Sequence, residues 1–182
     1  MPLPEPTMTV QDYWALPEGE RAELIHGKLW RLATPNRLHQ EISSALATAL
    51  SNHISSHGGS CRAYAAPFAV NLFADDSTIV EPDLLVVCDR GKLTDRGCEG
   101  APDLVVEIVS PASRQMDYGT KLNLYREAGV REYWIVDPSM GRTMAYRFDV
   151  DPAPAFYPFA TPVPCGVLEG LQVDFAAIVA DA

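Results

Sequence analysis

Apolar residues recur at helical spacing in three stretches of the chain. In the longest stretch Leu38, Ile42 and Leu46 lie four residues apart, with Ala45 and Ala49 beside them, so one face of a helix is apolar. The predicted helices cover residues 10–16, 37–55 and 114–128. Each follows a residue that can cap a helix N-terminus, and these are Thr9, Asn36 and Ser113. Glycines that can end a helix follow the second and third of them, at Gly58–Gly59 and Gly129.

Runs rich in Val, Ile, Leu and aromatic residues predict strands between and after these helices. The predicted strands are two short segments within 22–30 that meet at His26–Gly27, and then 62–66, 68–73, 83–88, 103–109, 131–136 and 143–148. The segment 103–136 is predicted as a strand–helix–strand crossover, which we expect to be right-handed. Five prolines between residues 151 and 164 indicate an irregular surface connection. The pattern therefore predicts α/β class, with one domain built on a mixed β-sheet flanked by helices.

The length and hydropathy of the chain support one soluble domain. A chain of 182 residues with 47% hydrophobic residues can bury a core, and we expect a single domain over residues 1–182. No apolar run approaches the roughly 18 residues of a membrane-spanning helix. The first ten residues, MPLPEPTMTV, lack the basic and apolar regions of a secretory signal, so we expect no membrane association and a cytoplasmic location. Open sheet edges and the strand at 143–148 indicate a homodimer.

Charge and cysteine usage narrow the possible functions. The chain carries 14 basic and 24 acidic residues, a formal net charge of −10. Such a chain repels polyanions at long range, which disfavours a nucleic-acid binder of the basic-patch kind and leaves acidic residues free to surround a metal ion. The cysteines form no CxxC pair and no zinc pattern with the four histidines, so we expect them to be reduced and structural.

Two carboxylates in neighbouring predicted strands are the strongest candidates for chemistry. The strands at 83–88 and 103–109 are joined by a polar loop of about a dozen residues, which favours antiparallel pairing with the loop centred near Arg96. That pairing places Asp83 near Glu107 on the same face of the sheet. A charged residue such as Glu107 inside an apolar strand is costly to bury without a partner. Two such carboxylates suit Mg²⁺ or Mn²⁺.

A second Pro-Asp pair, Pro102–Asp103, competes with Pro82–Asp83 for the same role. Asp103 and Glu107 lie four residues apart on one strand, or roughly 13 Å at the usual rise per residue. Oxygen ligands lie within about 2.6 Å of an ion of this kind, so Asp103 and Glu107 are too far apart to share one. Asp83 is therefore the better partner of Glu107.

The helix at 114–128 adds two further candidates. Asp117 and Lys121 are four residues apart on one helix face, with Arg114 and Tyr125 close to the same stripe. Taken alone, the pair could be a surface ion pair. Beside a carboxylate pair, Lys121 could orient or deprotonate a water and stabilise charge on phosphorus. His39, at the edge of an apolar stripe, could be a satisfied half-buried histidine or could face the site.

These residues resemble the Uma-two family, a branch of the PD-(D/E)XK nuclease superfamily. The resemblance covers residues 7–179 and is carried by the segments Glu81–Asp83, Ala101–Pro111, Asp117–Tyr125 and Glu132–Pro138. It implies a restriction-endonuclease-like core in which Asp83 and Glu107 bind the metal. The superfamily often places a lysine two residues after the acidic residue, where this chain has Val109, so the resemblance implies that Lys121 replaces it. It also implies a glutamate from the first part of the chain, either Glu41 or Glu23.

Three hypotheses follow. The first is a Mg²⁺- or Mn²⁺-dependent endonuclease that hydrolyses phosphodiester bonds of nucleic acid, with DNA as the expected substrate. The second is a catalytically silent nuclease-fold binding or assembly module, which the acidic charge and Val109 favour. The third is a hydrolase of small phosphoesters, which suits the acidic surface better than long DNA does.

Overall fold

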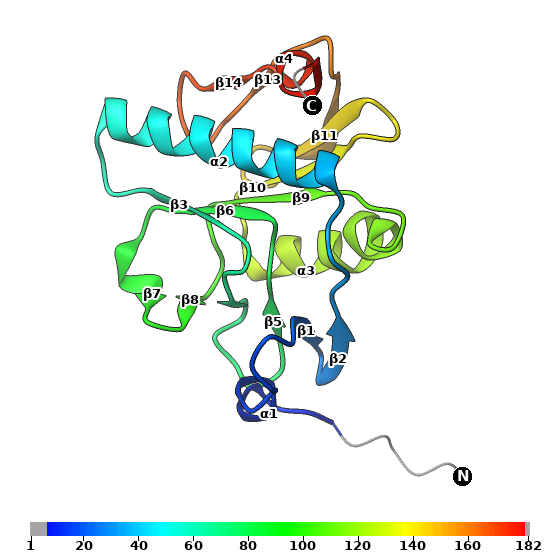
Figure 1. Cartoon of the computed structure of the whole chain (residues 1–182). Helices are drawn as coiled ribbons and strands as arrows, with labels where there is room; N and C mark the ends of the chain where they lie inside the picture. The colour runs from blue at the N-terminus through cyan, green and yellow to red at the C-terminus, as the bar shows by residue number, and fades with distance from the viewer. Residues whose placement is uncertain (1–6, 181–182) are drawn as a thin grey trace.

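The computed structural model describes residues 7–180, and its central feature is a six-stranded sheet. Its strands, in spatial order, are β12 (Asp151–Pro158), β11 (Arg142–Arg147), β10 (Glu132–Asp137), β9 (Leu104–Ile108), β6 (Leu84–Val87) and β3 (Arg62–Ala65). Helix α2 (Arg37–His57) lies on one face of this sheet and α3 (Lys121–Ala128) on the other (Figure 1). Strands β9 and β10 are parallel and their other neighbours antiparallel. The predicted α/β domain with a mixed sheet between helices is confirmed.

The two faces of the main sheet belong to separate apolar clusters. Leu104, Val106 and Ile108 of β9 pack in the cluster that contains α2, while Val105 and the following Val109 pack in the cluster that contains α3. Because both faces are covered, the strand is apolar almost throughout, as expected for buried strands. Glu107 is its one charged residue and lies on the α3 face with Val105.

A second sheet lies beside the main one and was not predicted as separate. It also has six strands, but they are shorter, and it is called the small sheet below. Its strands, in spatial order, are β2 (Lys28–Arg31), β1 (Ala22–Ile25), β5 (Ile79–Val80), β4 (Val70–Asn71), β8 (Gly97–Glu99) and β7 (Leu93–Thr94). The predicted hairpin at His26–Gly27 is confirmed, and both residues have positive φ, 49° and 74°. Helix α1 (Val10–Trp14), capped by Thr9 as predicted, lies next to this sheet (Figure 1).

The prediction of an irregular connection over 151–164 is wrong, because residues 151–158 form the edge strand β12. Proline lacks an N–H donor and is tolerated at a sheet edge, which explains a proline-rich strand there. Strand β11 consequently lies inside the sheet, between β10 and β12. The strand at 143–148 is therefore not the open edge that indicated a homodimer, and the homodimer stays a prediction. After β12 the chain forms β13 (Val163–Pro164), β14 (Gln172–Val173) and α4 (Phe175–Ala180).

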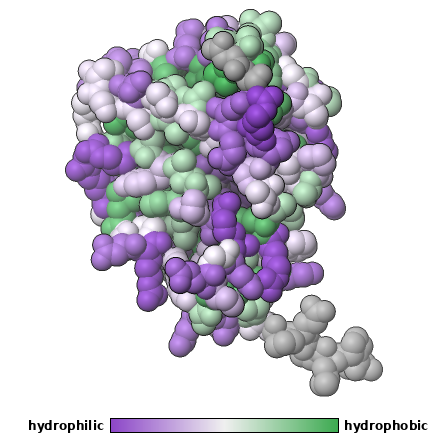
Figure 2. Space-filling view, viewed as in Figure 1, coloured by the Kyte–Doolittle hydropathy of each residue, from purple (hydrophilic) through white to green (hydrophobic). Residues whose placement is uncertain are grey.

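The surface of the described part of the chain mixes polar and apolar residues. Large hydrophobic side chains are exposed at separate places, and apolar residues are scattered among polar ones on the face seen in Figure 2. Within residues 7–180, no helix has both the length and the apolar character needed to cross a membrane. The expectations about a signal sequence and about the ends of the domain fall partly on residues 1–6 and 181–182, which lie outside the described residues.

The expectation that all four cysteines are reduced is wrong, because Cys61 and Cys88 form a disulfide. Strands β3 and β6 are antiparallel with Arg62 opposite Val87. The same register places Cys61, just before β3, opposite Cys88, just after β6. Sequence spacing between the two cysteines could not show this long-range register. Cys98 and Cys165 are free and buried. Disulfides persist in oxidising compartments and are rare in the reducing cytosol, so this bond disagrees with the expected cytoplasmic location.

We expect the denatured, unreduced protein to show two titratable thiols rather than four. Reduction, or the double change Cys61→Ser/Cys88→Ser, should lower the free energy of unfolding by about 3 kcal/mol, because the bond closes a loop across 27 residues. Thiol titration and denaturant unfolding measure both effects. Cys98→Ser is the control and should remove one thiol while leaving the disulfide in place. Four thiols in protein purified without reductant would contradict the pairing.

Candidate active site

The predicted neighbourhood of Asp83 and Glu107 is present. Strands β6 and β9 are antiparallel with Leu84 opposite Val106, so the same register places Asp83 opposite Glu107. The Oδ2 atom of Asp83 accepts a hydrogen bond from the backbone N–H of Ile108 at 2.7 Å, which holds Asp83 against β9. Residues directly opposite in an antiparallel pair have side chains on the same face. The two carboxylates therefore share one face at the end of β6.

Lys121 lies at the centre of a buried group of carboxylates. Its Nζ atom is 2.8 Å from Oε1 of Glu23, 2.9 Å from Oε1 of Glu107 and 3.9 Å from Oδ1 of Asp117. The side chain of Lys121 is only 5% exposed, and those of its three partners are 4% exposed or less. The interpretation of Asp117 and Lys121 as a surface ion pair is therefore wrong. The four residues come from different elements: Glu23 from β1, Glu107 from β9, Asp117 from the segment before α3, and Lys121 from the first position of α3.

Of the two candidate glutamates, the fold brings Glu23 to Lys121. Oε1 of Glu23 also accepts the backbone N–H of Glu81 at 2.9 Å, which ties β1 to the strand end that carries Asp83. Glu41 lies on α2 and pairs instead with Arg37 one helical turn earlier, at 2.6 Å. The sequence alone could not decide between Glu23 and Glu41, because β1 belongs to the small sheet, whose position is set by long-range contacts.

A π-helical segment, Met116–Thr120, positions Asp117 and interrupts the helix predicted over 114–128. Such segments are rare and frequently occur at functional sites. The hydroxyl of Tyr133 donates to the backbone carbonyl of Asp117 at 3.0 Å, within the buried core. The predicted N-cap Ser113 does not cap through its side chain, because its hydroxyl bonds with Ser110.

Both carboxylate oxygens of Asp117 lack a hydrogen-bond partner among the described residues. Burial raises the pKa of Asp117 to about 6, and the charges of Asp83 and Glu23 add to the rise against the opposing effect of Lys121. A buried carboxylate without hydrogen bonds is costly in the ionised form. Asp117 therefore adds negative charge to the site, which its ion pair with Lys121 at 3.9 Å offsets only in part.

Tyr125 is a member of the site that the sequence analysis did not select. Its hydroxyl donates to Oε1 of Glu107 at 2.6 Å, so this oxygen has both Tyr125 and Lys121 as partners. The available signal was spacing, since Tyr125 lies one helical turn after Lys121 on the same helix face. Arg114, near the same stripe, points elsewhere and donates to Asp137 at 2.8 Å.

The site carries more negative than positive charge. The carboxylates of Glu23, Asp83, Glu107 and Asp117 are accompanied by a single lysine. Burial raises the pKa of Glu107 well above its ordinary value, and the neighbouring carboxylates raise it further against the effect of Lys121. Burial alone would lower the pKa of Lys121, but Glu107, Glu23 and Asp117 outweigh it and raise that pKa well above the ordinary value. Lys121 is therefore protonated at neutral pH.

His39 joins the site from the first turn of α2. Its Nε2 atom is 3.1 Å from Oδ2 of Asp83, while its Nδ1 atom is buried and has no hydrogen-bond partner in the described part of the chain. Asn36 caps the helix as predicted, by accepting the backbone N–H of His39. His39 consequently faces the site, and the interpretation of a fully satisfied histidine is wrong.

Asp103 has a structural environment at the other end of β9. It accepts the backbone N–H of Cys88 at 2.7 Å and pairs with Arg131 at 3.3 Å. This agrees with the argument from strand rise that separated Asp103 from Glu107. The two Pro-Asp pairs of the sequence therefore have different surroundings, and only Asp83 lies with the buried carboxylates.

The donor set around Asp83 and Glu107 fits a hard divalent cation. Among residues 7–180 no group of three or more His, Cys, Asp or Glu side chains is arranged to hold a metal ion. Mg²⁺, however, is commonly bound by one or two carboxylates, with water and substrate phosphate completing its shell. The unpartnered oxygens of Asp117 and the excess of carboxylates over lysine favour a cation at this place.

Comparisons with known proteins concern the family and the fold of the chain. Residues 10–176 match the model of the Uma2 family, described as "Putative restriction endonuclease". The Synechocystis protein slr1290 is 27% identical over 124 residues, which cover 67% of this chain and 64% of that protein, so the chain spans less than two thirds of this curated relative. The crystal structure of "a putative nuclease belonging to DUF820" from Anabaena variabilis superposes with a TM-score of 0.77 at 21% identity, covering 95% of this chain and 98% of that chain.

The structural likeness shows that the two chains share a fold, and the family match extends over almost the whole described chain. The family match confirms the resemblance that the motifs around Asp83, Glu107 and Lys121 carry. The chain belongs to the Uma2 family.

Proposed function

We propose that the chain is an endonuclease that hydrolyses phosphodiester bonds of nucleic acid, with DNA as substrate and Mg²⁺ or Mn²⁺ as cofactor. The observation that carries the proposal is the buried group of three carboxylates around Lys121, next to the partly exposed Asp83. The description of the family and the neighbour's name as a nuclease support it.

In this proposal Asp83 and Glu107 hold the metal ion. Bound there, the ion would polarise a phosphoryl oxygen and lower the pKa of a water molecule. Ile108 N–H and His39 both contact Oδ2 of Asp83, which orients the carboxylate and leaves Oδ1 to face a ligand. Tyr125 and Lys121 likewise both contact Oε1 of Glu107. The protein thus orients both carboxylates before a ligand arrives.

Lys121 acts in this proposal as a fixed positive charge. Because Glu107 and Glu23 raise its pKa well above the ordinary value, Lys121 cannot take a proton from water at neutral pH. Two roles remain, to orient a water molecule and to stabilise negative charge on the phosphoryl group. Its two short ion pairs hold the ammonium group in one position, which such stabilisation requires.

Metal binding is the direct test. Titration calorimetry with Mg²⁺ and Mn²⁺ should show binding to the native chain and its loss in Asp83→Asn. The matched control is Asp103→Asn, which changes the other Pro-Asp pair at a similar exposure, 17% against 20%, and should bind like the native chain. Binding that Asp83→Asn leaves unchanged would contradict the assignment.

A cleavage screen separates the endonuclease from its rivals. Duplex DNA, single-stranded DNA, RNA and mononucleotides are offered over a range of salt concentrations, because the net charge of −10 repels polyanions and salt screens this repulsion. Hydrolysis of a polymer that requires Mg²⁺ or Mn²⁺ supports the proposal. Metal binding without hydrolysis would favour the silent binding or assembly module, and hydrolysis of nucleotides alone would favour the small-phosphoester hydrolase, which the acidic charge supports.

A further inference from the structure

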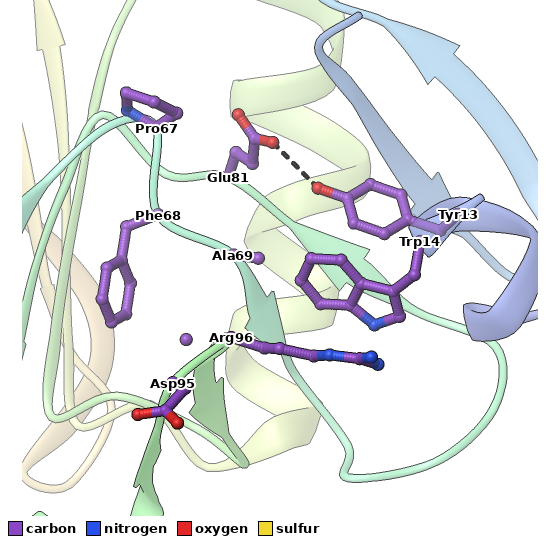
Figure 3. A pocket seen from close by; sticks show the side chains of 9 residues that line it. Tyr13, Trp14, Pro67, Phe68, Ala69, Glu81, Asp95 and Arg96 are labelled. Atoms are coloured by element: carbon purple, nitrogen blue, oxygen red, sulfur yellow. Dashed lines mark hydrogen bonds between the residues drawn. The ribbon is translucent and has the colours of Figure 1, made fainter. Parts of the chain in front are cut away.

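A cavity of about 300 Å³ lies outside the carboxylate site, where three segments distant in the sequence meet. Helix α1 contributes Trp14, the turn between β3 and β4 contributes Phe68, and the turn between β7 and β8 contributes Arg96. Figure 3 shows Trp14 and Phe68 on opposite sides of this pocket, with Ala69 between them. The pocket is therefore a slot with an aromatic ring on either side.

The walls of the slot are held in place by specific contacts. Phe68 stacks on Tyr64 with the ring centroids 4.2 Å apart, which fixes one wall. At the floor, Gly97 approaches Ala69 so closely that a Cβ atom at Gly97 would lie 2.0 Å from the carbonyl oxygen of Ala69. Only glycine permits this approach, which brings the β7–β8 turn against the turn that carries Phe68.

The polar groups at the rim can both accept and donate hydrogen bonds. The carboxylate of Glu81 is fixed by Tyr13, whose hydroxyl donates to Oε1 at 2.8 Å, and by Arg21, which donates to Oε2 at 3.0 and 3.1 Å. The exposed side chain of Asp95 is a second acceptor at the rim, and Arg96 is a donor. Aromatic faces combined with a few convergent polar groups are typical of sites for planar ligands.

The slot suits a neutral planar ring better than a cationic side chain. Aromatic faces bordered by carboxylates can bind an ammonium or guanidinium group. Here the chain's own Arg96 already places a positive charge near the Trp14 ring, with its guanidinium carbon 5.3 Å from the ring centre, so a second cation would be repelled while a neutral ring would not. Nucleobases stack on aromatic rings and on arginine, and their exocyclic amino groups donate to carboxylates.

The slot adjoins the carboxylate site. Glu81 lines the slot, lies two residues before Asp83, and donates its backbone N–H to Glu23, the ion-pair partner of Lys121. Two residues of extended chain span roughly 7 Å. A nucleotide in the slot would thus lie within a few nucleotides of a phosphate at Asp83.

We infer that this slot binds one unstacked nucleobase of the nucleic acid, between Trp14 and Phe68, and so positions the strand for cleavage. The inference rests on the proposed function and adds to it a subsite for the base. It also requires that the substrate be single-stranded or locally opened at this position, because a base inside a duplex cannot enter the slot.

The test compares oligonucleotides with and without bases in the absence of metal. A labelled single-stranded oligodeoxyadenylate and an abasic oligonucleotide of the same length are titrated with the protein in EDTA, and fluorescence anisotropy reports binding. We expect the native chain to bind the adenylate about tenfold more tightly than the abasic strand, as stacking of one base on an aromatic ring predicts. Trp14→Leu should remove this difference and leave abasic binding unchanged.

Trp30 provides the matched control, because it is exposed like Trp14, 40% against 38%, and also carries a cation, Lys28, over its ring. Trp30→Leu should retain the tenfold preference. A second variant, Phe68→Leu, removes the aromatic ring on the other side of the slot and should also reduce the preference for the adenylate over the abasic strand. Thermal unfolding checks that each variant is folded.

The possible failures are distinguishable. Equal binding of both oligonucleotides by a chain that cleaves nucleic acid would overturn the base subsite and leave the proposed function in place. No binding of either strand together with no cleavage would overturn both. Binding of a labelled oligolysine that Trp14→Leu abolishes, together with no preference for the adenylate over the abasic strand, would overturn the inference in favour of a cationic peptide.

Discussion

Replacing Glu107 with glutamine is expected to abolish metal-dependent hydrolysis while leaving the protein folded. The cleavage rate should fall by about a thousandfold or more, because the ion that Glu107 would help to hold contributes several kcal/mol to the stabilisation of charge on phosphorus. The amide of the Glu107→Gln variant would keep an oxygen that accepts from both Tyr125 and Lys121, whose distances to Oε1 are 2.6 and 2.9 Å in the native chain.

The stability of Glu107→Gln follows from the pKa of the native carboxyl group. Burial raises the pKa of Glu107 well above its ordinary value, so ionised Glu107 costs stability at pH values above its unfolded pKa. A neutral amide avoids this cost, and the variant should unfold at the same or higher denaturant concentration. Loss of activity together with retained stability then indicates a chemical role.

Glu132→Gln is the matched control for Glu107→Gln. Glu132 is a buried glutamate of the same sheet, but its Oε2 accepts the backbone N–H groups of Gly166 and Val167, at 2.8 Å each. Glu132→Gln should therefore leave the cleavage rate of the folded fraction unchanged, because Glu132 lies apart from the carboxylates around Lys121. A rate measurement on both variants shows the contrast, and denaturant unfolding checks that each is folded. A cleaving Glu107→Gln enzyme would contradict the proposed metal site.

Replacing Lys121 with methionine is expected to destabilise the fold strongly at pH 8. Removal of one partner of a buried ion pair costs about 3–5 kcal/mol, because the remaining charge is left uncompensated. Here Glu23, Glu107 and Asp117 would all lose their only nearby cation among the described residues. Urea unfolding at pH 8 measures the loss, and the folded fraction should show no cleavage.

The loss in Lys121→Met should be smaller at pH 5 than at pH 8. Without Lys121, burial and mutual repulsion keep the folded-state pKa values of Glu107 and Asp117 above the unfolded values. The native state then binds more protons than the unfolded state, and stability falls as pH rises between the two pKa values. A loss that does not change with pH would contradict the buried cluster.

Lys92→Met is the control for Lys121→Met. Lys92 donates to the backbone carbonyl of Ala101 at 2.8 Å and is half-buried, without an ion-pair partner among the described residues. Its replacement should lower the free energy of unfolding by about 1 kcal/mol, the usual contribution of one hydrogen bond, at both pH values. A larger and pH-dependent loss of stability in Lys121→Met than in Lys92→Met would show that the carboxylates around Lys121 cause it.

Much of the candidate site could be predicted from the sequence, because it depends on two neighbouring strands. The alternation of side chains and a loop centred near Arg96 were enough to place Asp83 opposite Glu107. The rise per residue along β9 was enough to separate Asp103 from Glu107. Helical spacing likewise placed Asp117 and Lys121 on one face, although it could not show how deeply that face is buried in the protein.

The sequence by itself determined the caps of α1 and α2, the main helices, the paired strands and the two carboxylates, since each depends on spacing within one segment or across one loop. Only the tertiary structure decided which groups surround them. Across long stretches of chain Glu23 pairs with Lys121 and Cys61 with Cys88, and Trp14 and Phe68 line one pocket. The packing of the two sheets also buries Lys121 and makes β12 an edge strand. Such contacts depend on how whole elements dock, and no local spacing along the chain encodes that.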